Sequence, residues 1–209
     1  MSAVNPFVST KKMIKTHVNK VVIMPDEDQK ALAGTVIEWG IERVAVTGTV
    51  VAVPDFLHFS KKKGSGGEYE SRMNSSMNCE SLEYDADMEL KVGDKVMFRF
   101  HSQVRDRCPY GLLVGYDQIY AKVVGGEVIP INGRIFGKLI SSDPKQITHA
   151  VCEIQAVGKP VRAYKFDDTP EPKGKYRKGQ KAWIKNAMPL DYNRTTVVFH
   201  RKDILALCD

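Results

Sequence analysis

The sequence lacks the short motifs that most often identify an enzyme or a metal site. Its 209 residues contain no G-x-S-x-G, Walker, H-E-x-x-H or dinucleotide-binding pattern. The four cysteines form no C-x-x-C pair, and the five histidines stand far from one another and, apart from His149 three residues before Cys152, from the cysteines. We therefore expect no catalytic residue and no metal ion, and we expect the cysteines to remain free thiols in a reducing compartment.

Long apolar runs are also missing. The first twenty residues contain no continuous apolar stretch of the kind found in signal peptides, and no run approaches the ~18 apolar residues that a membrane helix needs. The composition, 43% hydrophobic and 27% charged, is ordinary for a globular chain of one large domain or two small ones. These absences predict a soluble, cytoplasmic protein with no membrane contact.

Positive charge exceeds negative charge by 6, but the excess is confined to two segments. Residues 1–20 contain four lysines and no acidic residue, and residues 159–181 contain eight basic residues against three acidic ones. The rest of the chain is slightly acidic. A basic tail and a basic loop are typical of solvated segments, so we do not expect nucleic acid as the main partner.

Short runs of β-branched and aromatic residues dominate the hydrophobic pattern. These runs are residues 21–23, 44–53, 95–100 and 195–200. Only residues 26–33 and 203–207 could hold a turn or two of helix. The sequence therefore predicts an all-β protein with many short strands, built as a barrel or a sandwich.

Two polar stretches separate the predicted strands. Residues 54–90 and 159–177 are rich in Gly, Ser, Pro, Asp and Lys, which favour turns and loops. Both stretches predict long surface loops, and loops of this length are usually functional or disordered.

Three sequence landmarks occur twice in the same order, which indicates an internal repeat. A strand ending in A-V-P or A-V-G precedes each long loop, a Gly-centred turn into a strand follows it, and a D-Q-I-Y-A or K-D-I-L-A segment closes each copy. The matching pairs are residues 48–54 and 152–158, 91–98 and 177–184, and 117–121 and 202–206. The repeat predicts two units, residues 17–124 and 128–209, after an N-terminal extension of residues 1–16.

These landmarks resemble those of the GroES-type co-chaperonins, the ten-kilodalton lids of the chaperonin cage. The segments that carry the resemblance are A-V-G or A-V-P, K-V-G-D-K-V-M-F and the terminal D-I-L-A, and together they span both units. The resemblance implies two tandem GroES-like β-barrels, the second with a truncated docking loop. It also implies a ring-shaped homo-oligomer, seven chains for a sevenfold partner, that caps a GroEL-type chaperonin in the cytoplasm.

The resemblance further implies a role in ATP-dependent protein folding without enzymatic activity. ATP would be bound by the partner chaperonin, and this chain would need no cofactor. The long loops and the N-terminal extension set the chain apart from typical bacterial lids. They resemble a virus-encoded, phage-type co-chaperonin or one from an unusual bacterial lineage.

A mobile loop with a glycine and an apolar tripeptide docks such lids on the chaperonin. The segment of about residues 26–42 corresponds to this loop, and its implied chaperonin-binding residues are Ala33, Gly34, Thr35, Val36 and Ile37. Thr35 stands where the family has an aliphatic residue. In the second unit only residues 141–148 separate the matching strands, so each chain offers one docking loop. We expect such a segment to bury its apolar side chains only against a partner and to become ordered there. Several such weak contacts in one ring together give a strong interaction.

Three alternatives remain open. Thr35, Val36 and Ile37 could form an ordinary interior strand of the first unit. The chain could be a structural or assembly β-barrel protein, such as a virion component, that reuses the fold without a chaperonin. It could also be a basic nucleic-acid-binding barrel that uses the lysines of residues 11–20 and 61–63, in which case binding would weaken with salt.

Overall fold

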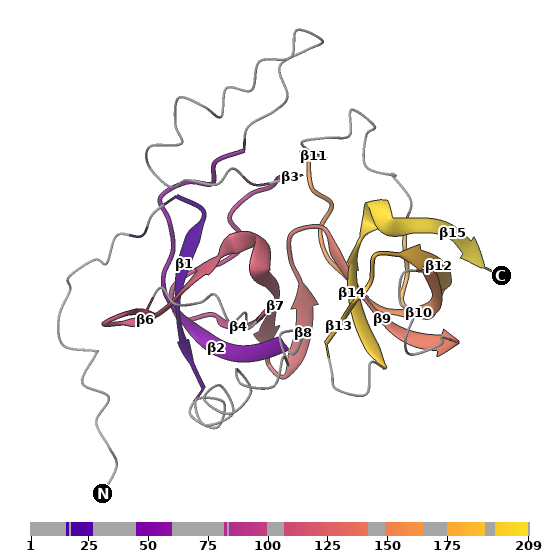
Figure 1. Ribbon diagram of the computed structural model, residues 1–209, viewed down its shortest axis with the longest axis horizontal. Coiled ribbons are helices and arrows are strands. Elements are labelled where there is room, and N and C mark those ends of the chain that lie inside the picture. The colour runs from indigo at the N-terminus through magenta and orange to yellow at the C-terminus, as the bar shows by residue number, and fades with distance from the viewer. Residues whose placement is uncertain are drawn as a thin grey trace, which may run out of the picture.

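The computed structural model confirms the predicted all-β class. It describes residues 16, 18–26, 45–59, 82, 84–99, 107–141, 149–164, 175–190 and 195–208. These residues form β-strands and two short 3-10 helices, with no α-helix among them. In Figure 1 the strands gather in two groups side by side, with β8 between them. Within the described ranges, no helix has the length and apolar character needed to cross a membrane.

Two antiparallel sheets account for most of the structure. In sheet order, the first contains β5 (Arg107–Cys108), β6 (Gly111–Gly115), β1 (Lys20–Pro25), β2 (Ala45–Ala52), β4 (Lys95–Arg99), β7 (Ile119–Val124) and β8 (Glu127–Pro130). The second contains β13 (Met188–Pro189), β14 (Thr196–His200), β9 (Arg134–Ser141), β10 (His149–Val157), β12 (Lys181–Lys185) and β15 (Ile204–Cys208). Apart from β8, the two sheets have the same strand order. The β5–β6 hairpin of the first sheet is followed by the 3-10 helix η5 (Tyr116–Gln118), and the β13–β14 hairpin of the second by η6 (Arg201–Asp203).

The repeat extends to individual hydrogen bonds. The amide of Gly93 donates to the carbonyl of Val50 at 2.9 Å, and the amide of Gly179 donates to that of Ile154 at 2.8 Å. The two glycines have φ angles of +91° and +88°, which glycine adopts without strain. The Gly-centred turns of the two sequence copies therefore have the same conformation and the same contact to the preceding strand.

Two expectations about secondary structure differ from the structure. Neither sheet closes into a barrel among the described residues, because the outer strands β5, β8, β13 and β15 do not pair across. The helix considered for residues 203–207 is wrong, since η6 ends at Asp203 and β15 begins at Ile204. The other helix considered, residues 26–33, lies outside the described residues beyond Asp26.

Parts of both predicted surface loops are buried instead. Leu82, Tyr84 and Leu90 from the first loop and Val161 and Tyr164 from the second belong to the hydrophobic cluster of the first sheet. The loops also pair directly, through the two-residue strands β3 (Tyr84–Asp85) and β11 (Ala163–Tyr164). A few apolar residues within polar stretches thus give these segments a role in the core, and the surface-loop prediction is wrong for them.

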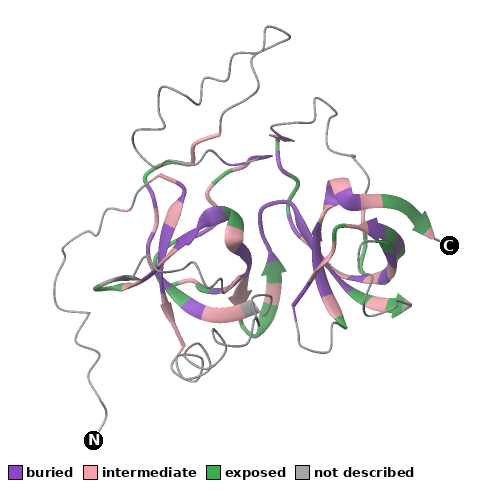
Figure 2. Cartoon of the chain, viewed as in Figure 1, coloured by how far each residue is buried: buried purple, intermediate pink, exposed green. Residues whose placement is uncertain are grey.

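Apolar side chains form three clusters, of which one lies between the sheets. The first and second clusters belong mainly to the first and second sheet. The third joins Tyr120 and Ala121 of β7 to Phe136 of β9 and Val198 of β14. Buried residues, purple in Figure 2, accordingly line the strands on both sides of β8. Because a buried apolar side chain of this size contributes about 1.5–3 kcal/mol, this cluster is a substantial link between the sheets.

A buried asparagine fixes the linker between the two sheets. Asn132 lies between β8 and β9, is fully buried and has a left-handed φ of +61°. Its side-chain nitrogen donates to the carbonyls of Tyr116 at 3.0 Å and Ile119 at 3.2 Å, and its amide donates to Glu89 Oε1 at 2.9 Å. The linker is thereby bonded to both ends of η5 and to the end of the first loop.

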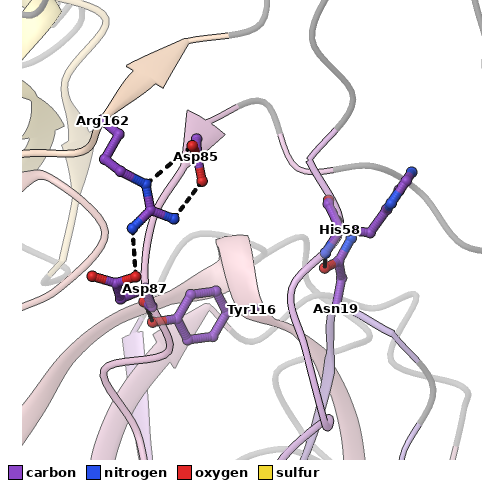
Figure 3. Close-up of polar contacts among 6 residues, drawn as sticks. All are labelled: Asn19, His58, Asp85, Asp87, Tyr116 and Arg162. Carbon is purple, nitrogen blue, oxygen red and sulfur yellow. Dashed lines mark hydrogen bonds and ion pairs between the residues drawn. The ribbon is translucent and has the colours of Figure 1, made fainter.

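Ionic contacts between the loops add to this junction (Figure 3). The Arg162 guanidinium binds both carboxylate oxygens of Asp85, at 2.6 and 3.0 Å, and also contacts the carboxylate of Asp87. The Tyr116 hydroxyl donates to the Asp87 carbonyl at 3.1 Å and accepts from the Glu89 amide at 2.9 Å. Arg162 is exposed, so its ion pairs orient the loops more than they stabilise them.

His200, the last residue of β14, packs at the same junction. Its ring centroid lies 5.7 Å from that of Tyr84 and 6.0 Å from that of Tyr164, which it meets edge-on. Burial, with smaller effects from the charges of Arg134 and Lys202, lowers the pKa of His200 to about 2. The imidazole is therefore neutral in the folded protein at any pH near neutrality.

We predict that replacing His200 by Phe makes the protein less sensitive to acid. Below pH ~6.5 the unfolded chain binds a proton at this histidine that the folded chain does not bind. The stability that the neutral ring contributes is complete above that pH and is lost as the pH falls. In urea unfolding, the stability loss between pH 7 and pH 5 should be smaller by about 2 kcal/mol in His200→Phe.

The control for this experiment is His149→Phe, which replaces an exposed histidine on β10. It should keep the acid sensitivity of the wild type. The raised pKa values of half-buried Glu89 and buried Asp203 act in the opposite direction, but they are present in all three proteins and cancel in the comparison. Equal pH dependence in wild type and His200→Phe would contradict the assignment.

Candidate docking and assembly sites

The structure describes the base of the predicted docking segment. The predicted docking residues themselves lie outside the described residues: Ala33, Gly34, Thr35, Val36 and Ile37. β1 and β2 pair antiparallel up to Pro25, opposite Gly48, so both ends of the connection leave the same end of the sheet. A Cβ on Gly48 would lie 2.6 Å from the Met24 carbonyl oxygen, so a glycine lets the strands approach closely here.

Asp26 fixes the start of this segment to two strands. Its amide donates to the Thr47 carbonyl at 3.2 Å, and its carboxylate accepts from the Thr47 hydroxyl and lies 3.1 Å from Lys95 Nζ. The hydrogen bond from Thr47, helped by Lys95 and opposed by burial, lowers the pKa of Asp26. The residue that follows β1 is therefore held in place by contacts to β2 and β4.

The two sheets differ most at this connection. In the first sheet, residues 26–44 separate β1 from β2, whereas only residues 142–148 separate β9 from β10. The strands that flank the two connections occupy the same positions in the sheet order. The two copies therefore share a topology but differ in the length of the connection between equivalent strands, β1–β2 in the first sheet and β9–β10 in the second.

A second candidate site is the outer edge of the second sheet. β15 pairs with β12 on one side and has no strand on the other side in the part of the chain that the structure describes. Leu205 and Leu207 on β15 are 43% and 48% exposed, and Trp183 on β12 is 46% exposed. An apolar strand with an unpaired edge is a template for pairing with another chain.

The first sheet shows what covers the equivalent edge. There β7 occupies the position of β15, and β8 pairs along its outer side. Met97 and Ala121, directly opposite each other on β4 and β7, contribute to the cluster between the sheets. The corresponding pair in the second sheet, Trp183 opposite Ala206, is exposed. The surface that is covered in the first copy is thus uncovered in the second.

Among the described residues, no three His, Cys, Asp or Glu side chains could together hold a metal ion. Burial, with a smaller effect from Cys208, raises the pKa of Cys152 to about 12, so it is held as a thiol. A cleft of about 260 Å³ between the sheets is lined by Arg99, Tyr120, Asn186, Ala187, Met188 and Pro189.

The exposed edge of β15 and Trp183 were not predicted from the sequence, although the residue pattern around Trp183 indicates its exposure. In K-A-W-I-K, residues 181–185, Trp183 alternates with two small or aliphatic residues and so lies on the opposite face of the strand from them. That pattern indicates an exposed tryptophan. The lysines proposed for nucleic-acid binding, residues 11–20 and 61–63, lie outside the described residues except for Lys20.

No family model matches this chain, and no curated protein matches it. The repeated topology, the anchored β1–β2 connection and the uncovered β15 edge are therefore the features of this chain that bear on its function.

We predict that Asp26→Asn weakens the anchor of the docking segment. The variant loses a charge-assisted hydrogen bond and an ion pair that are partly exposed, so its free energy of unfolding at pH 7 should fall by about 1 kcal/mol. Because the Asp26 pKa is lowered, this stability is present above the ordinary pKa of the carboxyl and is lost as the pH falls below it. Urea unfolding at pH 7 and pH 3 measures both effects.

Asp55→Asn is the matched control, because Asp55 is exposed just beyond β2. It should change stability by no more than about 0.5 kcal/mol. An Asp26→Asn variant as stable as wild type at pH 7 would show that the anchor contributes nothing.

Proposed function

We propose that this protein is a co-chaperonin that caps a GroEL-type chaperonin ring and assists ATP-dependent folding in the cytoplasm of a bacterium or an infected host. The docking contact is made by the segment that contains Gly34, Val36 and Ile37, and ATP is bound and hydrolysed by the partner alone. The observation that carries the proposal is the duplicated strand order, with the same Gly-centred turn in both copies. The sequence motifs from which the resemblance was inferred recur at equivalent points of two related sheets, and this recurrence supports the proposal.

The geometry of the β1–β2 connection supports docking through this segment. A long connection that starts from a fixed point can reach a partner while its base stays in the sheet. We expect each docking contact to be weak if the segment becomes ordered only on its partner, because such ordering costs free energy. Several copies in one ring would engage together, so that later contacts become effectively intramolecular. Since the second sheet has only a short connection at the same place, each chain contributes one docking segment.

The uncovered edge of the second sheet supports self-association. Within one chain, β8 and the second sheet cover β7 and Met97. If a neighbouring chain covers β15 and Trp183 in the same way, the copies join head to tail. Head-to-tail contacts close into a ring when the rotation between copies allows it. This is the arrangement that the proposed lid needs, with seven chains matching a sevenfold chaperonin.

The same edge favours a second candidate function, a structural or assembly protein. An apolar edge that recruits further copies would suit a shell or virion component without any chaperonin. The two functions differ in what the segment of residues 26–42 does. Chaperonin binding separates them, because only the lid requires that segment to bind a partner.

We predict that Val36→Ser combined with Ile37→Ser abolishes chaperonin binding. Removing both apolar side chains removes the burial that offsets the ordering cost of the segment. The wild type should co-elute with a GroEL-type chaperonin when ATP is present, whereas the double variant should not. If the wild type binds no chaperonin, including that of its own host, the lid function fails and the assembly function remains.

A matched control is Val92→Ser combined with Val124→Ser, which makes the same chemical change at two exposed positions of the described structure. This control should bind the chaperonin like wild type. Loss of binding in both double variants would indicate that the effect is not specific to the docking segment.

We predict that Trp183→Lys combined with Leu207→Lys dissociates the oligomer. The two lysines place charge on the apolar edge, which disfavours burial against a second copy. Native mass spectrometry should find a multimer for wild type and a monomer for this variant, while Val92→Lys, an exposed control, should remain a multimer. A monomeric wild type would remove the basis for a ring.

A further inference from the structure

A buried arginine with unused hydrogen-bond donors lies where the two sheets meet. Arg134, the first residue of β9, is 4% exposed. Its Nη2 atom donates to the carbonyl of Asp117 at 2.5 Å, and its guanidinium carbon lies 4.9 Å from the centre of the Tyr120 ring. Its Nε and Nη1 atoms are buried and have no hydrogen-bond partner in the described structure. Leaving such donors unpaired is costly, since they have lost water without replacement.

Two further buried polar groups lie close to this cation. The Tyr84 side chain on β3 is 2% exposed, and its hydroxyl has no partner among the described residues. His200 lies directly opposite Arg134 in the β14–β9 register, and its side chain faces the Asp203 amide in the capping box of η6. The Tyr84 and His200 rings are neighbours, and the charge of Arg134 acts on both groups.

The neighbourhood of Arg134 contains no carboxylate that pairs with it in the described part of the chain. Asp85 and Asp87 bind Arg162 instead, and Asp117 meets Arg134 with its main-chain carbonyl. Lys202, whose Nζ lies 4.8 Å from the centre of the Tyr164 ring, adds a second positive charge nearby. The charge of Asp117 acts on Tyr84 and Tyr120, but its carboxylate forms no ion pair with Arg134. Two N–H groups of Arg134 therefore have no acceptor among the described residues.

We propose that a small inorganic anion the size of chloride binds between Arg134 and Tyr84, beside the His200 ring. The anion accepts hydrogen bonds from the free N–H groups of Arg134 and from the Tyr84 hydroxyl. A single water could accept from Nε and Nη1 of Arg134 and donate to the Tyr84 hydroxyl, but it brings no charge to balance the guanidinium. An anion accepts from the same donors and supplies that charge.

This anion would connect the two copies of the repeat. Arg134 and His200 belong to the second sheet, whereas Tyr84 comes from the loop that packs on the first. A ligand that binds only the folded protein raises its stability with the logarithm of ligand concentration. The inference depends on neither chaperonin binding nor oligomer formation, so it can fail or succeed independently of the proposed function.

The test compares thermal unfolding in sodium chloride and sodium gluconate at equal ionic strength. Above the dissociation constant, each tenfold increase in chloride should raise the unfolding midpoint by about 3–6 °C, whereas gluconate, which is too large for the site, should not. Tyr84→Phe keeps the ring but loses one donor and should reduce the chloride shift. Arg134→Met should abolish it, and Arg162→Met, which removes an exposed arginine of the same junction, should retain it.

Crystals grown in sodium bromide give a direct readout that does not depend on variants. An anomalous peak within hydrogen-bond distance of Arg134 Nε or Nη1 and the Tyr84 hydroxyl would support the proposal. A water molecule at that position without anomalous signal would overturn it. Equal midpoints in chloride and gluconate, or a chloride shift that survives Arg134→Met, would overturn it as well.

Discussion

The arrangement of the two sheets depends on the buried linker at Asn132. A fully buried polar residue is costly unless its polar groups find partners inside the protein. The side-chain nitrogen and the backbone amide of Asn132 do so by donating to η5 and to Glu89, whereas its Oδ1 atom has no hydrogen-bond partner among the described residues. Its left-handed backbone turns the chain from β8 into β9. With this turn fixed, β8 pairs with β7 and Phe136 reaches the cluster between the sheets.

The repeat gives the two sheets the same topology but different surroundings. The first sheet has its last strand covered by β8 and carries the long β1–β2 connection, whereas the second has an open β15 edge and a short connection. One copy therefore supplies the segment that we propose for docking, and the other supplies an edge suited to self-association. The lid that we propose would need both functions, and the duplication would divide them between two related sheets.

The sequence predicts most of the strands and the order of the repeat, because both depend on local signals. Alternating residues in 95–99 and the glycines at 93 and 179 specify strand and turn without distant contacts. The burial of Tyr84 and Tyr164 could not be predicted this way, since it arises from pairing between loops about eighty residues apart. The same holds for Arg134, whose burial depends on both sheets meeting. The docking residues, Gly34 among them, remain a prediction from resemblance.

Hydrogen–deuterium exchange would show whether residues 33–37 bind a chaperonin, as we propose. The full-length protein would be exchanged alone, with ATP, and with ATP and a GroEL-type chaperonin. We expect the amides of residues 33–37 to become protected only when chaperonin and ATP are both present, while β1 and β2 change little. Unchanged exchange at residues 33–37 in a mixture with chaperonin and ATP would contradict the proposed docking contact.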